Sequence, residues 1–549
     1  MSHPSAPLSA SLVCTGLGFS WPDGRSLFQD FDLVIGPGRT GLIGLNGSGK
    51  STLLRLLAGE LRPDTGRVSV TGVLGHLRQN LSLDAGLPVA DALGIGETCA
   101  ALRAIERGET TEENFALVGD DWDVQERARA TLDRLGLTAV RLDQRIGHLS
   151  GGQSVLLGLA GQLLRRPDVL LLDEPTNNLD RDARQHLYDA VAGWKGVLVV
   201  VSHDRELLQL VDRVADLRDG EVHWYGGNFS AYETALAIEQ EAAERMVRVA
   251  GADVRRQQRE LVETQIKLGQ RQRYGQKMYD SKREPRVVMR QRRKQAEVSS
   301  GKLRNEHRAK VAEATERLAE AELAVRQDDE IRVDLAATEV PAGRTVLTLR
   351  GVRPRYAAED VSIHIELRGP ERVALLGGNG AGKTTLLRTI AGELAPLTGE
   401  VDRAVPLRYL PQRLDVLDDS LSLVGNVARL APSATENQIR ARLARFLFRG
   451  GRADQQVATL SGGERFRATL AALMLAEPAP QLLLLDEPTN NLDLASVRRL
   501  ATALASYQGA LLVASHDLAF LRDIGLTRRL HLDPATGLST GQPDQGDRS

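Results

Sequence analysis

The stretch GLIGLNGSGKSTLLRLLAGEL, Gly41–Leu61, decides the fold because it returns later in the chain as ALLGGNGAGKTTLLRTIAGEL, Ala374–Leu394. Both copies contain the pattern Gly-x4-Gly-Lys-Ser/Thr, which is typical of a phosphate-binding P-loop. In each copy a short apolar run precedes the pattern and a helical run follows it. Strand, loop and helix in this order are the context that a P-loop requires. The chain is therefore predicted to contain two copies of one α/β nucleotide-binding domain.

Each P-loop is expected to wrap backbone N–H groups around phosphate oxygens, because glycine permits the tight turns and a helix N-terminus favours an anion. The two lysines would neutralise the β- and γ-phosphates of ATP, and the hydroxyl after each lysine would bind Mg2+. The predicted nucleotide-binding residues are Gly44, Leu45, Asn46, Gly47, Ser48, Gly49, Lys50, Ser51 and Thr52, and Gly377, Gly378, Asn379, Gly380, Ala381, Gly382, Lys383, Thr384 and Thr385.

A second stretch, LLLDEPTNNLD, also occurs twice, at Leu170–Asp180 and Leu483–Asp493. Its apolar run predicts a buried parallel strand, so the two acids should lie at the ligand edge of a doubly wound sheet. The first acid of each pair is expected to hold the metal through water, and the second to polarise the attacking water as catalytic base. These residues are Asp173 and Asp486 for the metal, and Glu174 and Glu487 for the base.

Two further repeats complete each half. LSGGQ and LSGGE precede the acid pair, and VVSHD and VASHD follow it at the same spacing. The order and spacing of these motifs resemble those of ATP-binding cassette proteins over most of the chain. The resemblance implies that the two cassettes pair head to tail within one chain, and that each ATP lies between one P-loop and the LSGG segment of the other cassette.

The same resemblance implies two composite sites, both intact. Site one would combine Lys50, Glu174 and catalytic His203 with Ser461, Gly462, Gly463 and Glu464. Site two would combine Lys383, Glu487 and catalytic His516 with Ser150, Gly151, Gly152 and Gln153. Gln79 and Gln412 resemble the glutamine that contacts the metal in such proteins. Trp21 and Tyr356 resemble the aromatic residue that stacks on adenine, although packing in the core would explain them equally well.

The segment between the cassettes is not duplicated and predicts a two-helix hairpin. Apolar residues recur at coiled-coil spacing at Val247, Val254, Leu261 and Leu268, and at Val311, Ala314, Leu318, Ala321 and Val325. The part nearest its turn is basic: residues 271–294 hold ten Lys/Arg and two acids, on a chain whose net charge is -2. A solvated helix face is one explanation, and a polyanion target is the other. The predicted RNA-binding residues are Lys282, Arg283, Arg286, Arg290, Arg292, Arg293 and Lys294.

The entry to this segment, HWYGGNFSAYE at His223–Glu233, is similar to the end of the first cassette in ABC-F proteins. That resemblance implies a hairpin that reaches from the ribosomal E site towards P-site tRNA and the peptidyl-transferase centre. It implies rRNA and P-site tRNA as partners, and either protection of the ribosome from antibiotics or general assistance of translation. An ATPase subunit that drives a separate efflux permease is the second alternative, and an excision-type DNA-repair ATPase would need zinc-binding cysteines.

The remaining features of the sequence concern the cellular compartment, the oligomeric state and the domain boundaries. Two cysteines in 549 residues favour a reducing cytoplasm, and no apolar run approaches the roughly 18 residues that span a membrane. The chain is expected to act as a monomer. The segment between Gln79 and Ser150 is longer than its counterpart in the second cassette, and predicts either a small arm or a plain surface loop. The expected domains are a first cassette (8–232), a helical linker (233–343), a second cassette (344–535) and a disordered tail (536–549).

Overall fold

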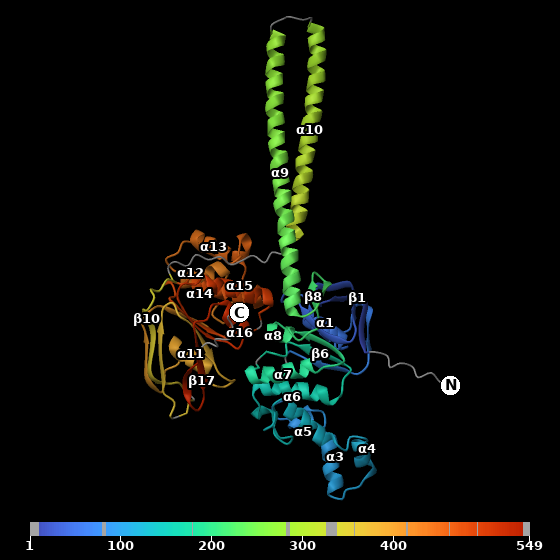
Figure 1. The fold of residues 1–549 in the computed structure, drawn as a ribbon, viewed down its shortest axis with the longest axis vertical. Helices are drawn as coiled ribbons and strands as arrows, with labels where there is room; N and C mark the ends of the chain where they lie inside the picture. The colour runs from blue at the N-terminus through green and yellow to red at the C-terminus, as the bar shows by residue number, and fades with distance from the viewer. Residues whose placement is uncertain are drawn as a thin grey trace, which may run out of the picture. The chain divides into compact units, whose positions relative to one another are not determined.

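The computed structural model describes residues 10–79, 84–177, 179–280, 286–324, 338–355, 357–358, 360–412, 415–460, 462–490 and 492–541. Contacts divide the chain into one unit that holds both cassettes and a second unit, Ser230–Asp328, that holds the interdomain helices. The predicted class is confirmed: two α/β cassettes are joined by a long helical insert (Figure 1).

The first cassette contains two sheets. The antiparallel sheet has the order β2-β1-β4, and the main sheet has the order β5-β6-β7-β3-β8-β9, parallel except for the β8–β9 pair. The strands are β1 (Ser11–Ser20), β2 (Ser26–Ile35), β3 (Gly38–Ile43), β4 (Thr65–Thr71), β5 (Leu74–Leu77), β6 (Val169–Asp173), β7 (Val197–Val201), β8 (Arg213–Arg218) and β9 (Glu221–Gly226). The helices are α1 (Lys50–Leu57), α2 (Val89–Ala92), α3 (Gly96–Glu106), α4 (Glu112–Val118), α5 (Val124–Arg134), α6 (Gly151–Leu164), α7 (Arg181–Ala192) and α8 (Arg205–Leu208), with a 3-10 turn at Ile146–His148.

The second cassette repeats this plan. Its antiparallel sheet has the order β11-β10-β13 and its main sheet the order β14-β15-β16-β12-β17-β18. The strands are β10 (Thr345–Arg353), β11 (Ile363–Arg368), β12 (Arg372–Leu376), β13 (Thr398–Arg403), β14 (Leu407–Leu410), β15 (Leu482–Asp486), β16 (Ala510–Ala514), β17 (Arg528–Asp533) and β18 (Gly537–Gly541). The helices are α11 (Lys383–Ala391), α12 (Leu423–Leu430), α13 (Glu436–Arg445), α14 (Gly462–Met474), α15 (Leu494–Ala505) and α16 (Leu518–Asp523), with 3-10 turns at Gly450–Asp454 and Val457–Thr459.

The central strands of both main sheets are buried along their whole length. Every residue of β6 and β7 is buried, and so is every residue of β15 and β16. Such strands have helices on both faces, so their sequences are nearly continuous apolar runs. The parallel register places the carboxyl ends of these strands at one edge of the sheet, next to the end of the P-loop strand.

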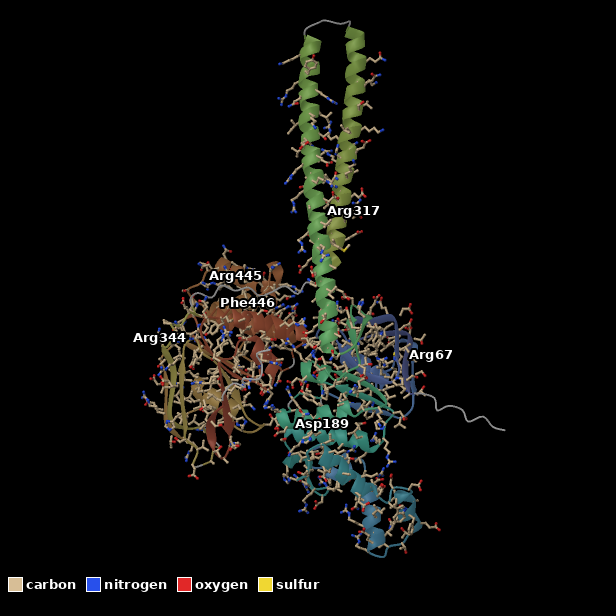
Figure 2. All side chains as sticks on the ribbon, in the orientation of Figure 1. Arg67, Asp189, Arg317, Arg344, Arg445 and Phe446 are labelled. Atoms are coloured by element: carbon tan, nitrogen blue, oxygen red, sulfur yellow. The ribbon has the colours of Figure 1, made fainter. Side chains whose placement is uncertain are left out.

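The second unit is a hairpin of two long helices, α9 (Phe229–Asp280) and α10 (Arg286–Ala324), which lie side by side in Figure 1. At 1.5 Å per residue, the 52 residues of α9 extend about 78 Å. Val254 and Ala314 are buried, and the other described members of the predicted apolar set are half-buried, which is the pattern of a narrow coiled-coil seam. The surface outside this seam carries many charged side chains, among them Arg317, which Figure 2 labels, and it also exposes apolar side chains such as Val249 and Ile266.

The element boundaries differ from the sequence expectation in three places. Helix α9 begins at Phe229, before the expected start of the helical linker at 233, and it continues through Gly275, since one glycine costs a helix only about 1 kcal/mol. Strand β18 pairs with β17 up to Gly541, so a disordered tail from 536 is wrong for residues 537–541. The longer segment of the first cassette is not a plain loop, because it folds into α3 and α4, and the ring of Phe115 in α4 lies against that of Trp122, which follows this helix.

Among the residues that the structure describes, no helix combines the length and apolar character needed to cross a membrane.

Candidate active site

The two P-loops have the same geometry. Gly47 and Gly380 adopt positive φ values of 83° and 80°, where a side chain would be strained, and nothing lies within 4 Å of the position that a Cβ would take. Helix α1 begins at Lys50 and α11 at Lys383, each directly after a left-handed glycine. The loops therefore leave space beside a helix N-terminus, as a phosphate site requires.

The P-loop lysines are held by the loops that precede them. Nζ of Lys50 donates to the carbonyl oxygens of Gly44 (2.8 Å) and Leu45 (3.0 Å). Nζ of Lys383 donates to the carbonyl of Gly377 at 2.7 Å and lies 2.9 Å from Nε2 of His516. Burial lowers the pKa of both lysines.

The predicted metal-binding acids lie beside the P-loop hydroxyls. Asp173 ends β6, and its Oδ1 accepts a hydrogen bond of 3.0 Å from Oγ of Ser51. Asp486 ends β15 and accepts a side-chain hydrogen bond from Thr384 and one of 3.2 Å from the hydroxyl of Tyr409. Carboxylate and hydroxyl oxygens are the hard donors that Mg2+ prefers, so both sets fit this ion.

The predicted catalytic bases, buried Glu174 and largely buried Glu487, are held in a strained conformation. Glu174 and Glu487 follow the strand-end aspartates with φ values of 47° and 45°, a left-handed region that residues other than glycine seldom occupy. Nε2 of His203 lies 3.1 Å from Oε1 of Glu174, and Nε2 of His516 lies 3.4 Å from Oε1 of Glu487. Strain of this kind gathers at functional sites, where the surrounding fold keeps a side chain in one direction.

Burial sets the protonation of these groups. It raises the pKa of Glu174 to about 8 and that of Glu487 to about 7, while the P-loop lysines oppose the rise. Burial also lowers the pKa of His203 and of His516 to about 3, so both imidazoles are neutral near pH 7. A glutamate with a pKa near neutrality is suited to accept a proton at physiological pH.

Residues of both cassettes line each P-loop pocket. The pocket of site one, about 460 Å3, is bounded by Lys50, Glu174 and His203 and also by Gly462 of the second cassette. The pocket of site two, about 530 Å3, is lined by the equivalent residues of the second cassette together with Ser150 and Gly151 of the first. The predicted exchange of LSGG segments is thus the arrangement that the structure has.

Two aspartates add contacts that the sequence analysis did not assign. Oδ2 of Asp493 accepts a hydrogen bond of 2.8 Å from the backbone N–H of Asn46, in the P-loop of the other cassette. Oδ2 of Asp180 accepts the reciprocal bond, 3.3 Å long, from the N–H of Asn379. Each aspartate also caps the helix that follows it, α15 or α7. The sequence signal that could have indicated these contacts is the repeated ending NNLD, whose aspartate stands at the same place in both copies.

The remaining predicted residues differ in where the structure places them. Trp21, Thr52 and Gln79 line the pocket of site one, and Thr385 and Gln412 line that of site two. The side chain of Gln153 forms a capping box with Ser150 at the start of α6, so it serves the helix rather than the pocket. Neither Gly152, Gly463 nor Glu464 lines a pocket described here. Ser461, Tyr356, Lys282 and Arg283 lie outside the described residues, and Arg286, Arg290, Arg292, Arg293 and Lys294 belong to α10.

Two P-loop domains in one chain, each facing the LSGG segment of the other, define an ATPase of the ATP-binding cassette class. In agreement, the ABC transporter family profile matches residues 28–177 and 361–490. The chain is 34% identical over 534 residues to the Tylosin resistance ATP-binding protein TlrC of Streptomyces fradiae, covering 90% of this chain and 92% of TlrC. It is 33% identical over 548 residues to the Probable ATP-binding protein YheS of Escherichia coli K12, covering 93% of this chain and 78% of YheS. The protein belongs to the ABC-F family of tandem ATP-binding cassette proteins.

Solved structures support the fold alone. The archaeal ribosome recycling factor aABCE1, solved in complex with the ribosomal stalk protein aP1, matches with a TM-score of 0.53 at 18% identity, over 96% of this chain and 89% of that one. The chain titled RNase-L Inhibitor matches with a TM-score of 0.52 at 19% identity, over 93% of this chain and 87% of that one. Tandem cassettes in one polypeptide are thus common to these proteins.

The pH dependence of hydrolysis is expected to differ between the two sites. A protonated glutamic acid cannot accept a proton, so the rate at each site should rise as pH increases through the pKa of its glutamate. In the Glu487→Gln variant only site one remains active, and its rate should rise with pH through about pH 8. In the Glu174→Gln variant only site two remains active, and its rate should rise through about pH 7. Steady-state phosphate release by the two variants between pH 6 and 9.5 measures this. Identical profiles would contradict the predicted order.

Proposed function

We propose that this ATPase binds the ribosome in the E site and uses ATP binding and hydrolysis to gate the entry of its hairpin towards P-site tRNA and the peptidyl-transferase centre. The observation that carries the proposal is the basic end of the hairpin, where residues 271–294 hold ten Lys/Arg against two acids. A concentrated positive charge on a chain with a net charge of -2 favours a polyanion as the target. An rRNA and tRNA target places this activity in the cytoplasm.

Each ATP would be bound by residues of both cassettes. Binding of the nucleotide would therefore bring the cassettes together, and hydrolysis would let them separate. In site one, the carboxylate of Glu174 accepts a proton from the water that attacks the γ-phosphate, and His203 keeps this carboxylate in place. Ser51, Asp173 and Gln79 would hold Mg2+, and Thr384, Asp486 and Gln412 would hold it in site two. The bound ion would neutralise charge on the phosphates. All of these contacts lie within one chain, which is consistent with a monomer.

The physiological role that we propose is protection of the ribosome from antibiotics bound at the peptidyl-transferase centre or the tunnel entrance. The similarity to TlrC over 92% of that protein supports this role, because its name records resistance to tylosin. A basic hairpin end that carries Val287, Val288 and Met289 among its charges could displace tRNA or rRNA near the drug. Drug occupancy would then fall without any transport.

Expression in a susceptible host is expected to raise the minimum inhibitory concentration of tylosin or of another drug of this region. The effect should disappear in the Glu174→Gln/Glu487→Gln variant, and when Ser281–Gln295 is replaced by a short Gly/Ser turn. Intracellular drug, measured with radiolabelled compound, should remain at the level of the host without the protein, since the drug leaves the ribosome and not the cell.

Two outcomes would favour other functions. Tolerance accompanied by reduced drug accumulation would favour an ATPase subunit that drives a separate efflux permease. Unchanged tolerance to every drug of this region, together with altered translation in a reconstituted system, would favour a general translation factor of the same family.

A further inference from the structure

The two ATP sites differ in the residue that stands beside the strand-end aspartate. Strand β5 leads into the sequence HLRQ and β14 into YLPQ, so His76 and Tyr409 hold equivalent places. In the parallel register His76 lies opposite Leu171 of β6, and Tyr409 lies opposite Leu484 of β15. Side chains two residues apart on a strand share a face. Each of the two residues therefore lies on the same face as the aspartate that ends the neighbouring strand.

In site two this residue is a tyrosine that holds the aspartate directly. The hydroxyl of Tyr409 donates to Oδ2 of Asp486 at 3.2 Å, and Thr384 donates a second side-chain hydrogen bond to the same carboxylate. Asp486 is only 1% exposed, so bulk water does not compete for these contacts. Two donors from different elements fix the rotation of the carboxylate as well as its position.

In site one the equivalent residue is bonded to a different carboxylate. Nδ1 of His76 lies 2.8 Å from Oε1 of Glu60, and Nε of Arg78 donates to the same oxygen at 2.8 Å. Nε2 of His76 is buried and has no hydrogen-bond partner among the residues that the structure describes. The side chain of Asp173 accepts a hydrogen bond from Ser51, but it receives none from His76.

The difference follows from the residues that surround these two positions. Arg78 of site one is replaced by Pro411 in site two. The equivalent of Glu60 in site two is Glu393, which pairs with Arg388 at 2.9 Å. The phenol hydroxyl of site two therefore stays available to the aspartate. An imidazole is also shorter than a phenol, so the histidine of site one extends less far along the sheet.

We propose that Tyr409 is a positioning residue that fixes Asp486 for Mg2+ in site two. Site one lacks this support, because His76 makes no hydrogen bond to Asp173, and it therefore holds Mg2+ more weakly. The inference rests on the metal sites of the proposed function. Mg2+ demands near-ideal octahedral geometry, so a carboxylate that holds it through water has to keep one orientation. Outer partners of this kind contribute about 10- to 100-fold to metal affinity, and we expect a difference of about tenfold between the sites.

The test measures how strongly Mg2+ favours nucleotide binding at one site at a time. In the full-length protein, Lys50→Ala leaves site two and Lys383→Ala leaves site one. The dissociation constant of a fluorescent, non-hydrolysable ATP analogue is measured in EDTA and in Mg2+. The ratio of the two constants reports the metal affinity of the nucleotide complex, because the coupling between two ligands is reciprocal. In the Lys50→Ala background, Tyr409→Phe should lower this ratio about tenfold by weakening binding in Mg2+ alone.

Exchanging the two sequences should exchange the behaviour of the sites. Tyr409→His should lower the ratio of site two as Tyr409→Phe does. His76→Tyr/Arg78→Pro introduces YLPQ into the first cassette, and in the Lys383→Ala background it should raise the ratio of site one towards that of site two. Turnover provides a second measurement: in the Glu174→Gln variant, Tyr409→Phe should raise the half-saturating Mg2+ concentration about tenfold, whereas kcat at saturating Mg2+ should change little.

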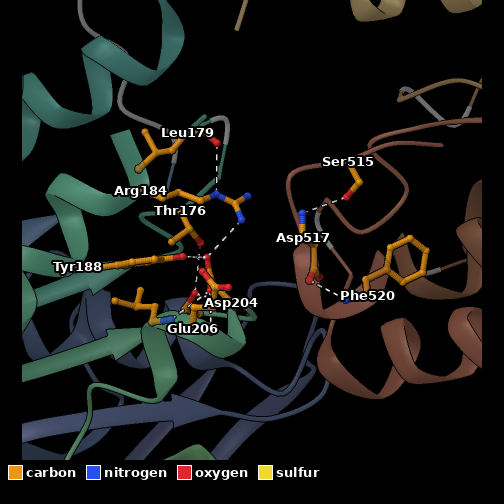
Figure 3. A network of polar contacts seen from close by, with 11 residues as sticks. Thr176, Leu179, Arg184, Tyr188, Asp204, Glu206, Ser515, Asp517 and Phe520 are labelled. Carbon is orange, nitrogen blue, oxygen red and sulfur yellow. Dashed lines mark hydrogen bonds and ion pairs between the residues drawn. The ribbon is translucent and has the colours of Figure 1, made fainter. Parts of the chain in front are cut away.

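Tyr188 of the first cassette provides the matched control. Its hydroxyl donates to Oδ2 of Asp204 at 2.7 Å, as Figure 3 shows, so Tyr188→Phe also removes a hydrogen bond from a tyrosine to a carboxylate. Asp204 is not among the residues proposed to hold Mg2+. Tyr188→Phe should therefore leave the ratio of both sites unchanged. If it lowers the ratio as strongly as Tyr409→Phe does, the effect belongs to packing and the inference is wrong.

The possible failures are distinguishable. If Tyr409→Phe weakens binding equally in Mg2+ and in EDTA, the tyrosine supports the pocket rather than the metal, and the inference is wrong. An unchanged ratio in site two would also overturn it. If Mg2+ strengthens nucleotide binding at neither site of the two background variants, the assignments of Asp173 and Asp486 to the metal are wrong, and the inference is lost with them. Ribosome protection is tested separately by the drug tolerance of the expressing host, which none of these outcomes decides.

Discussion

ATP turnover is expected to fall by about 10²- to 10⁴-fold when Glu174 and Glu487 are both changed to glutamine, the range that a lost general base produces. Glutamine keeps the size of the side chain but cannot take the proton of the attacking water. Binding of ATP should be retained, because the P-loops and LSGG segments are untouched. Phosphate release and equilibrium binding of a fluorescent ATP analogue measure the two effects separately, and ATP should then trap the double variant on ribosomes in a co-sedimentation assay.

A matched pair of substitutions controls for the loss of two carboxylates. Glu221→Gln and Glu400→Gln remove one exposed glutamate from each cassette, on strands β9 and β13, and should leave turnover and sedimentation unchanged. If the Glu174→Gln/Glu487→Gln variant hydrolyses ATP at the wild-type rate, these glutamates are not the catalytic bases. Loss of ATP binding would show that these residues support the pocket rather than activate water.

The duplicated motifs allowed the fold and most of the two pockets to be predicted, because each motif depends on local order along the chain. A P-loop needs a strand before it and a helix after it, and both can be seen around Lys50 and Lys383 in the sequence. The acid pairs follow apolar runs, which locates them at the edge of a buried sheet. The prediction that the cassettes exchange their LSGG segments came from the resemblance to ATP-binding cassette proteins. No local sequence pattern indicates which P-loop each LSGG segment contacts.

What could not be predicted depends on contacts between distant residues or on backbone strain. The bond from the Asn46 N–H to Asp493 joins residues of different cassettes. The positive φ of Glu174 has no sequence signature, because glutamate normally avoids that region. Arg184 carries no motif at all, and only the structure shows that it lines the pocket of site two with Glu487 and His516.

Ribosome affinity is expected to fall on the order of 10²-fold or more, at about 100 mM salt, when four basic residues of the hairpin are neutralised. Arg290, Arg292, Arg293 and Lys294 lie in α10, close in sequence to the turn of the hairpin. Each phosphate contact releases counterions, so the slope of log K against log salt should flatten by about 3 when four contacts are lost. Sedimentation of the Glu174→Gln/Glu487→Gln variant with ribosomes, over a range of salt concentrations, measures both quantities.

Four other arginines of the same hairpin provide the matched control. Arg245 and Arg248 pair with Glu241 and Glu244 within α9, and Arg256 and Arg317 also have acidic partners. Changing these four arginines to glutamine removes the same amount of positive charge. It does so in a part of the hairpin where acidic and basic residues are nearly equal in number. Such pairs contribute little to stability at an exposed surface, so the helices should remain folded by circular dichroism.

If this control variant loses affinity and salt dependence as strongly as the variant at Arg290, Arg292, Arg293 and Lys294, net charge alone attracts the protein to ribosomes. If neither variant loses affinity, the basic end of the hairpin is only a solvated surface, and the cassettes must supply the contacts with the ribosome.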